Sequence, residues 1–88
     1  MKIVIDNKIP FTEGVFEPYA DVRYMDGPLI SHADVKDADA LIIRTRTRCD
    51  ETLLKDSAVK IIATTTVGTD NIDIDYCRRH GIFFKNAS

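Results

Sequence analysis

Residues 59–84 read VKIIATTTVGTDNIDIDYCRRHGIFF, with an apolar run near each end and a polar, charged segment between them. The runs Val59–Ala63 and Ile82–Phe84 are short and rich in β-branched or aromatic residues, as is typical of buried strands. Between them, Asp73 can cap the start of a helix, and Gly81 can end it in a left-handed conformation. The order strand, helix, strand favours a right-handed crossover between parallel strands, and therefore an α/β fold.

Further apolar runs extend this pattern toward the N-terminus, at Ile3–Ile5 and Ala40–Ile43. The segment Asp21–Met25 alternates polar and apolar residues, which suits a strand at the edge of a sheet. Helix start signals precede three more segments, at Thr12 (running to about Tyr19), Ser31 and Asp50. We therefore predict a flavodoxin-like, doubly wound parallel sheet of five strands in the order 2-1-3-4-5.

The composition fits a single soluble domain. The chain has 88 residues, 44% of them hydrophobic, which is enough for one modest core. No apolar run approaches the roughly 20 residues that a bilayer helix needs, and no signal-peptide pattern follows Met1. We therefore expect a cytoplasmic protein without a membrane partner. The net charge of -2 argues against nucleic acid as a partner, because nucleic acid requires a broad basic surface.

The cysteine, glycine and histidine patterns contain no cofactor or metal motif. Cys49 and Cys77 form no CxxC pair and no zinc-type spacing, so we expect packed, reduced thiols rather than a disulfide. The four glycines form neither GxGxxG nor GxxxxGK, so no residue is assigned to cofactor binding. His32 and His80 fall near expected helix ends, and spacing alone assembles no nucleophile, base and acid. We therefore assign no catalytic and no metal-binding residue.

The chemistry is expected where two neighbouring strands end. The segment RTRTR at residues 44–48 follows one predicted strand, and TTTVGTDNID at residues 64–73 begins where the next one ends. Ligands of open α/β sheets bind beyond the carboxyl ends of the strands, so both loops should face one crevice. A turn at Gly68 can offer backbone amides to an anion there.

An extended backbone at residues 44–48 would send Arg44, Arg46 and Arg48 to one side and the intervening threonines to the other. Guanidinium groups match the geometry of carboxylates and phosphates, so this arrangement suits a small anion. Arg44 leaves the strand first and is expected to point most directly into the crevice, whereas Arg48 is expected to be solvated. The alternative is a solvated strand end whose arginines pair with nearby acids, namely Asp37, Asp39 or Glu51.

These segments, together with VIDNKIPF at residues 4–11 and ADALIIRTRTRCDETLL at residues 38–54, resemble the N-terminal substrate domain of the D-2-hydroxyacid dehydrogenase family. The family signature corresponds to residues 67–73, and RTRT after ADALII indicates a phosphorylated hydroxy acid as substrate. The resemblance implies an oxidoreductase that passes hydride from this acid to NAD. It implies substrate contacts from Thr45 and Thr66, with the Val67 and Gly68 amides near the carboxylate. The charge of Arg44 and Arg46 suggests that they bind the phosphate.

Complete members of this family carry a separate NAD-binding Rossmann domain, which supplies the glycine-rich loop and the catalytic Arg, Glu and His. The resemblance therefore implies that residues 1–88 are a substrate-binding domain, that a domain absent from this chain binds NAD, and that the chain alone is inactive. It also implies a homodimer for the complete enzyme. A later segment of complete members returns to this domain, so we expect apolar surface to be left uncovered. The alternative is a stand-alone module that binds a small anion or docks on a partner without catalysis.

Overall fold

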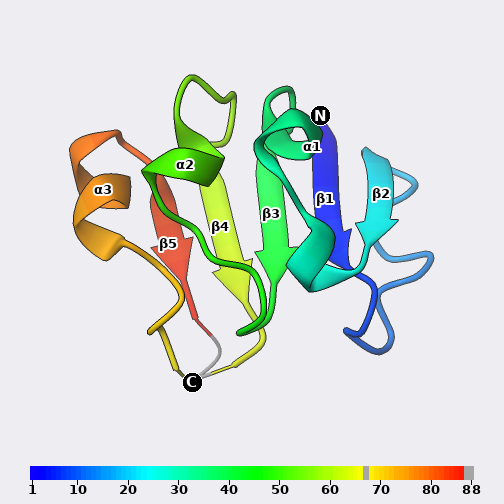
Figure 1. Ribbon diagram of the computed structural model, residues 1–88. Coiled ribbons are helices and arrows are strands. Elements are labelled where there is room, and N and C mark those ends of the chain that lie inside the picture. Colours follow the sequence, from blue (N-terminus) through cyan, green and yellow to red (C-terminus); the bar gives the residue numbers. More distant parts are fainter. Residues whose placement is uncertain (67, 87–88) are drawn as a thin grey trace.

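The computed structural model describes residues 1–66 and 68–86, which form a five-stranded parallel sheet (Figure 1). The strands are β1 (Lys2–Asp6), β2 (Asp21–Met25), β3 (Ala40–Ile43), β4 (Ile61–Thr64) and β5 (Phe83–Lys85). Their order is β2-β1-β3-β4-β5, and every neighbouring pair is parallel. The predicted α/β class, the strand order and the edge position of residues 21–25 are therefore confirmed.

The helices begin at the predicted caps. They are α1 (His32–Val35), α2 (Glu51–Leu54) and α3 (Ile74–Arg79), and a 3-10 helix, η1 (Gly27–Leu29), precedes α1. Asp50 accepts a hydrogen bond from the Leu53 amide at 3.2 Å, and Asp73 accepts one from the Tyr76 amide at 3.0 Å. These bonds satisfy amides that a helix N-terminus leaves free. Within the described residues, no helix has the length and apolar character needed to cross a bilayer.

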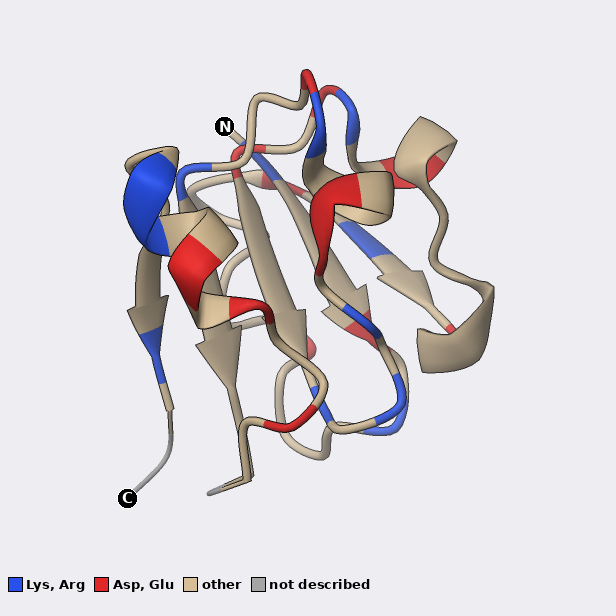
Figure 2. Ribbon diagram, turned by 60° about the vertical axis from the view of Figure 1, so that its left-hand side comes forward, with Lys and Arg blue, Asp and Glu red and all other residues tan. Residues whose placement is uncertain are grey.

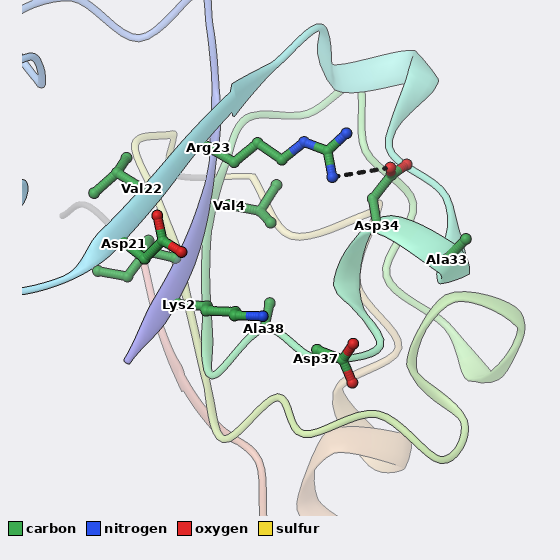
Figure 3. A pocket seen from close by; sticks show the side chains of 10 residues that line it. Lys2, Val4, Asp21, Val22, Arg23, Ala33, Asp34, Asp37 and Ala38 are labelled. Carbon is green, nitrogen blue, oxygen red and sulfur yellow. Dashed lines mark ion pairs between the residues drawn. The ribbon is translucent and has the colours of Figure 1, made fainter.

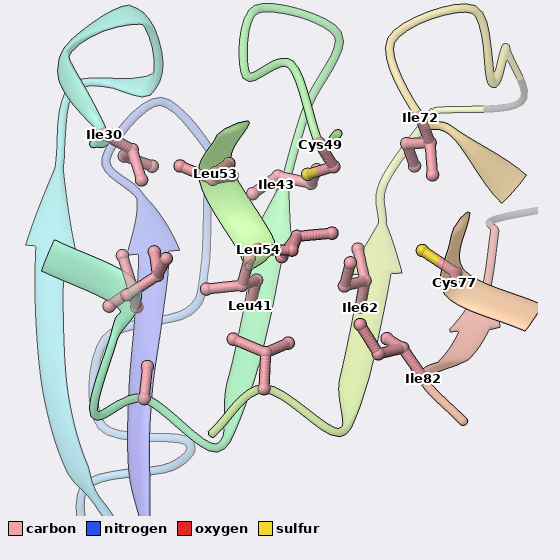
Figure 4. Close-up of a cluster of buried hydrophobic side chains, with 14 of the residues drawn as sticks. Ile30, Leu41, Ile43, Cys49, Leu53, Leu54, Ile62, Ile72, Cys77 and Ile82 are labelled. Atoms are coloured by element: carbon pink, nitrogen blue, oxygen red, sulfur yellow. The ribbon is translucent and has the colours of Figure 1, made fainter. Parts of the chain in front are cut away.

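The three α-helices pack on one face of the sheet and bury the larger core there (Figures 1 and 4). Leu41 and Ile43 of β3 and Ile62 of β4 are completely buried, and Leu53 and Leu54 of α2 belong to the same cluster. Successive side chains of a strand point to opposite faces, so alternate residues of each strand serve this core.

Residues 7–20 cover the opposite face over β1 and β2. Ile3 and Ile5 pack there with Ile9 and the half-buried Phe16. The predicted helix from Thr12 to Tyr19 is wrong, because this segment forms turns. A continuous right-handed helix is incompatible with its backbone, because φ is +84° at Gly14. The residue directly before the segment, Phe11, also has a positive φ of +63°.

The same face is open over β4 and β5. Ile61 and Phe83 are register partners there, with exposed fractions of 41% and 61%. The next pair, Ile62 and Phe84, turns toward the helices and packs in the larger core. We call Ile61 and Phe83 the open apolar patch. Uncovered apolar surface was expected from the sequence, and this patch provides it.

Candidate functional site

The loops that follow β3 and β4 share one cavity. Because β3 and β4 are neighbours, residues 44–50 and the described residues of the second loop (65, 66 and 68–73) leave the sheet at the same edge. In Figure 2, charged segments lie in the loops beyond the arrowheads of the strands, and others lie on the helices and at the opposite end of the sheet. Between the two loops lies a cavity of about 330 Å³, here called the interloop cavity, lined by Thr45, Arg46, Arg48, Gly68, Asp70 and Asn71. The prediction that both loops face one crevice is therefore confirmed.

Hydrogen bonds tie the two loops to each other. The Cys49 amide donates to the Asn71 carbonyl at 2.7 Å, and the Asp73 amide donates to the Cys49 carbonyl at 2.8 Å. The side-chain nitrogen of Asn71 donates to the carbonyls of Arg44 at 3.0 Å and Thr47 at 2.7 Å. The walls of the cavity are therefore held together by both backbone and side-chain bonds.

The predicted alternation across residues 44–48 is not realised. A turn at Thr45 and Arg46 interrupts the extended backbone. Thr47 is buried and donates its hydroxyl to the Gly27 carbonyl at 3.0 Å, whereas Thr45 is exposed. The two threonines therefore do not line one surface. Arg44 was expected to point most directly into the crevice, but it does not line the cavity. Its Nη1 instead donates to the Lys8 carbonyl, in the turn after β1, at 3.3 Å.

Arg46 and Arg48 are the arginines that line the interloop cavity. Arg46 Nη1 lies 3.9 Å from Asp26 Oδ1, and Arg48 Nε lies 3.2 Å from Asp50 Oδ2. These partners differ from the acids considered in the solvated alternative. The arginine side chains are 54% and 79% exposed, and ion pairs at such exposure are weak. Both guanidinium groups are therefore available to an incoming anion.

The second loop contributes Gly68 to the cavity, but Thr66 does not line it. The Thr66 hydroxyl is buried and has no hydrogen-bond partner among the described residues. Its carbonyl accepts a hydrogen bond from the Thr64 hydroxyl at 2.9 Å. Val67, whose amide was assigned to the substrate carboxylate, lies outside the described residues.

Asp6, Gly27 and Thr47 form a buried cluster that sequence reasoning missed. Asp6 ends β1 and is 1% exposed. Its Oδ1 accepts a hydrogen bond from the Lys8 amide at 2.8 Å, whereas its Oδ2 has no partner among residues 1–66 and 68–86. A Cβ at Gly27 would lie only 2.5 Å from that oxygen. The only sequence signal was a carboxylate directly after an apolar run, which a solvated strand end would also produce.

A second cavity, of about 320 Å³, lies at the opposite end of the sheet between β1, β2 and α1 (Figure 3). Arg23 reaches from β2 toward α1, where its Nη1 is 3.8 Å from Asp34 Oδ1. Lys2 and Asp37 add a further charge of each sign. This wall of mixed charge lies at the amino ends of the strands, whereas open α/β sheets bind ligands at the carboxyl ends. The interloop cavity is therefore the candidate site.

The thiols and imidazoles lie outside the candidate chemistry. Burial, with smaller contributions from Cys77 and Asp50, raises the pKa of the Cys49 thiol to about 12. Burial also raises the pKa of Cys77, so both free thiols stay protonated and unreactive near neutral pH. His32 Nε2 lies 2.7 Å from the Lys55 carbonyl, and His80 stacks on the ring of Tyr76 in α3. Within the described residues, no group of His, Cys, Asp or Glu is arranged to hold a metal ion.

A parallel sheet with a cationic cavity at its carboxyl edge agrees with the family comparison. Residues 3–88 match the model of the catalytic domain of D-isomer specific 2-hydroxyacid dehydrogenases, and the chain belongs to this family. Individual members of the family that are similar to this chain have more specific names. An erythronate-4-phosphate dehydrogenase of Bacteroides fragilis is 54% identical over 88 residues, which cover 99% of this chain and 25% of the relative. One from Acinetobacter baumannii is 39% identical, over 100% of this chain and 25% of the relative.

The chain therefore spans about a quarter of the length of the curated relatives it matches. Solved structures show the same fold. A 3-phosphoglycerate dehydrogenase of Entamoeba histolytica, with NAD+ bound, has a TM-score of 0.79 and 33% identity, over 98% of this chain and 32% of that one. A D-lactate dehydrogenase of Aquifex aeolicus has a TM-score of 0.74 and 22% identity, over 97% of this chain and 27% of that one.

Proposed function

We propose that this chain is the substrate-binding domain of an NAD-dependent dehydrogenase. The reaction is the oxidation of 4-phospho-D-erythronate to 2-oxo-3-hydroxy-4-phosphobutanoate, in the biosynthesis of pyridoxal phosphate (vitamin B6), by an enzyme that acts as a homodimer. The observation that carries the proposal is the interloop cavity with its two arginines, in a chain 54% identical to an erythronate-4-phosphate dehydrogenase.

The substrate carries a carboxylate at one end and a phosphate at the other, and a guanidinium can bind either group through paired hydrogen bonds. Thr45, Arg46 and Gly68 line the cavity, which supports them as substrate contacts. Arg48 joins them because it lines the same cavity. Arg44 and Thr66 lie outside the lining, so any contact from them requires the loops to rearrange around the ligand.

The residues present do not fit NAD. A dinucleotide needs a glycine-rich turn that leads into a helix, and Gly68 is the single glycine in the lining of the interloop cavity. Gly14 and Gly81 lie in separate turns. We therefore place NAD binding outside this chain and assign no hydride-transfer step and no catalytic base to its residues. The role of this domain is to bind and orient the hydroxy acid.

A second candidate function is a non-catalytic module that binds a small anion or docks on a partner. The open apolar patch favours it, because exposed apolar surface is a common feature of protein interfaces. The two functions differ in ligand choice. A substrate-binding domain must distinguish the phosphorylated acid from its unphosphorylated analogue, whereas a docking module has no such requirement.

Isothermal titration of the chain with 4-phosphoerythronate and with erythronate tests the proposal. We expect clear preference for the phosphorylated acid. Arg46→Ala and Arg48→Ala should each weaken 4-phosphoerythronate about tenfold and erythronate little, because each removes a charged hydrogen-bond donor. Lys60→Ala is the matched control, since Lys60 is an exposed cation just before β4, at the far end of the sheet. Equal affinity for both acids, unchanged by the arginine substitutions, would refute the proposed function.

A further inference from the structure

The side chain of Asn71 joins the two loops of the interloop cavity. Its Nδ2 donates one hydrogen bond to the Arg44 carbonyl at 3.0 Å and one to the Thr47 carbonyl at 2.7 Å. Both amide protons are therefore used, and this fixes which end of the carboxamide carries nitrogen. The Oδ1 atom is buried and has no hydrogen-bond partner among the described residues.

The two carbonyls that Asn71 contacts flank the turn at Thr45 and Arg46. The side chain therefore holds both ends of the turn that carries Arg46 into the cavity lining. The backbone of Asn71 is itself fixed to the same loop, because its carbonyl accepts the Cys49 amide at 2.7 Å. A displacement of Asn71 would move the second loop and release the turn at the same time.

We propose that Asn71 is a positioning residue that holds the Thr45–Arg46 turn and thereby sets the width of the interloop cavity and the placement of the Arg46 guanidinium. The inference rests on the proposed function, and it concerns how the site discriminates rather than what it binds. An amide is required here. A carboxylate of the same shape has no proton for either carbonyl and brings a negative charge to a site for an anion.

Two variants test the inference by titration with 4-phosphoerythronate and with erythronate. Asn71→Ala removes the side-chain amide, and Asn71→Asp keeps the shape but removes both donors. We expect the Kd for 4-phosphoerythronate to rise about tenfold in each, with a smaller rise for erythronate, because two hydrogen bonds that place Arg46 are lost. Asn7→Ala is the matched control, because Asn7 is an exposed asparagine after β1, and its Kd should equal that of the wild type.

A merely structural role would lower the melting temperature of both Asn71 variants and leave both Kd values within twofold of the wild type. That result overturns the inference while the proposed function stands. If the wild type binds neither acid, the proposed function fails, and ligand-free NMR spectra decide the inference. Shifted and more rapidly exchanging amides of Thr45 and Arg46 in Asn71→Ala would support the role of Asn71, and an unaltered spectrum of these residues would overturn it.

If neither variant folds, the wild-type chain still decides. The Asn71 side-chain protons should exchange slowly with solvent, and their resonances should shift together with the Arg46 amide during titration with 4-phosphoerythronate. Rapid exchange of these protons, or an Arg46 shift without an Asn71 shift, would refute the inference.

Discussion

Replacing Gly27 with alanine tests how closely the end of β1 is packed against the segments that follow β2 and β3. The new Cβ would lie 2.5 Å from Asp6 Oδ2, about 0.9 Å inside the 3.4 Å at which ordinary contact begins, and 3.2 Å from Thr47 Oγ1. Asp6 cannot retreat freely, because it is 1% exposed and its other oxygen accepts the Lys8 amide. Overpacking of this kind costs about 1 to 3 kcal/mol, so we expect the free energy of unfolding to fall by about 2 kcal/mol.

Urea unfolding followed by circular dichroism measures this loss directly. In a domain of this size, a loss of 1 kcal/mol in unfolding free energy lowers the melting temperature by about 4 to 8 °C, so the Tm of Gly27→Ala should fall by about 8 to 16 °C. Gly68→Ala is the matched control. A Cβ at Gly68 would meet nothing within 4 Å, so its free energy of unfolding should stay within about 0.5 kcal/mol of the wild type.

A double-mutant cycle separates the collision with Asp6 from a general intolerance of alanine at position 27. In an Asp6→Ala background the nearest atom is gone, so adding Gly27→Ala should cost less than half of its cost in the wild type. The reasoning is refuted if Gly27→Ala is as stable as Gly68→Ala, or if its cost is the same with and without the Asp6 carboxylate.

Three further predictions follow from the surface and the site. Phe83→Lys places a charge in the open apolar patch, so it should reduce the self-association that light scattering detects at high protein concentration. Glu13→Lys, at an exposed site outside the patch, is the control. A wild-type chain that is strictly monomeric would contradict this prediction. Hydrogen bonds from the Ser31 amide and hydroxyl lower the pKa of Asp34 below its ordinary 3.8. The pKa of Asp34 is therefore lower in the folded than in the unfolded chain, so its stabilising effect is complete above about pH 4 and is lost as pH falls through the folded pKa. The difference in unfolding free energy between the wild type and Asp34→Asn should shrink over the same range. A difference that does not change with pH would argue against this prediction. The purified chain with 4-phosphoerythronate and NAD should form no NADH, and NADH formation proportional to chain concentration would reveal a catalytic centre within it.

The sequence could locate the candidate site but not orient its side chains. Both loops were found because a polar segment after a buried strand must leave the sheet at its carboxyl end, whatever its detailed conformation. Arg48 is solvated as expected, with 79% of its side chain exposed, but the Arg44 guanidinium reaches the Lys8 carbonyl and a turn at Thr45 and Arg46 breaks the predicted alternation. That turn is held by Asn71, which is distant in sequence, so no local pattern around the arginines could reveal it.

Local periodicity and capping chemistry were enough to place the five strands and the starts of α1, α2 and α3, although the cap at Thr12 began no helix, and the strand order followed from the right-handed crossover rule. Apolar runs of strand length and residues such as Asp50 and Asp73 act through neighbours only a few positions away. The buried contacts of Asp6 with Gly27, and the irregular cover of residues 7–20, were decided only by the tertiary structure. The cover of residues 7–20 depends on positive backbone φ angles. The packing of Asp6 against Gly27 depends on the close approach of segments that are distant in sequence, and no short stretch of sequence can predict such an approach.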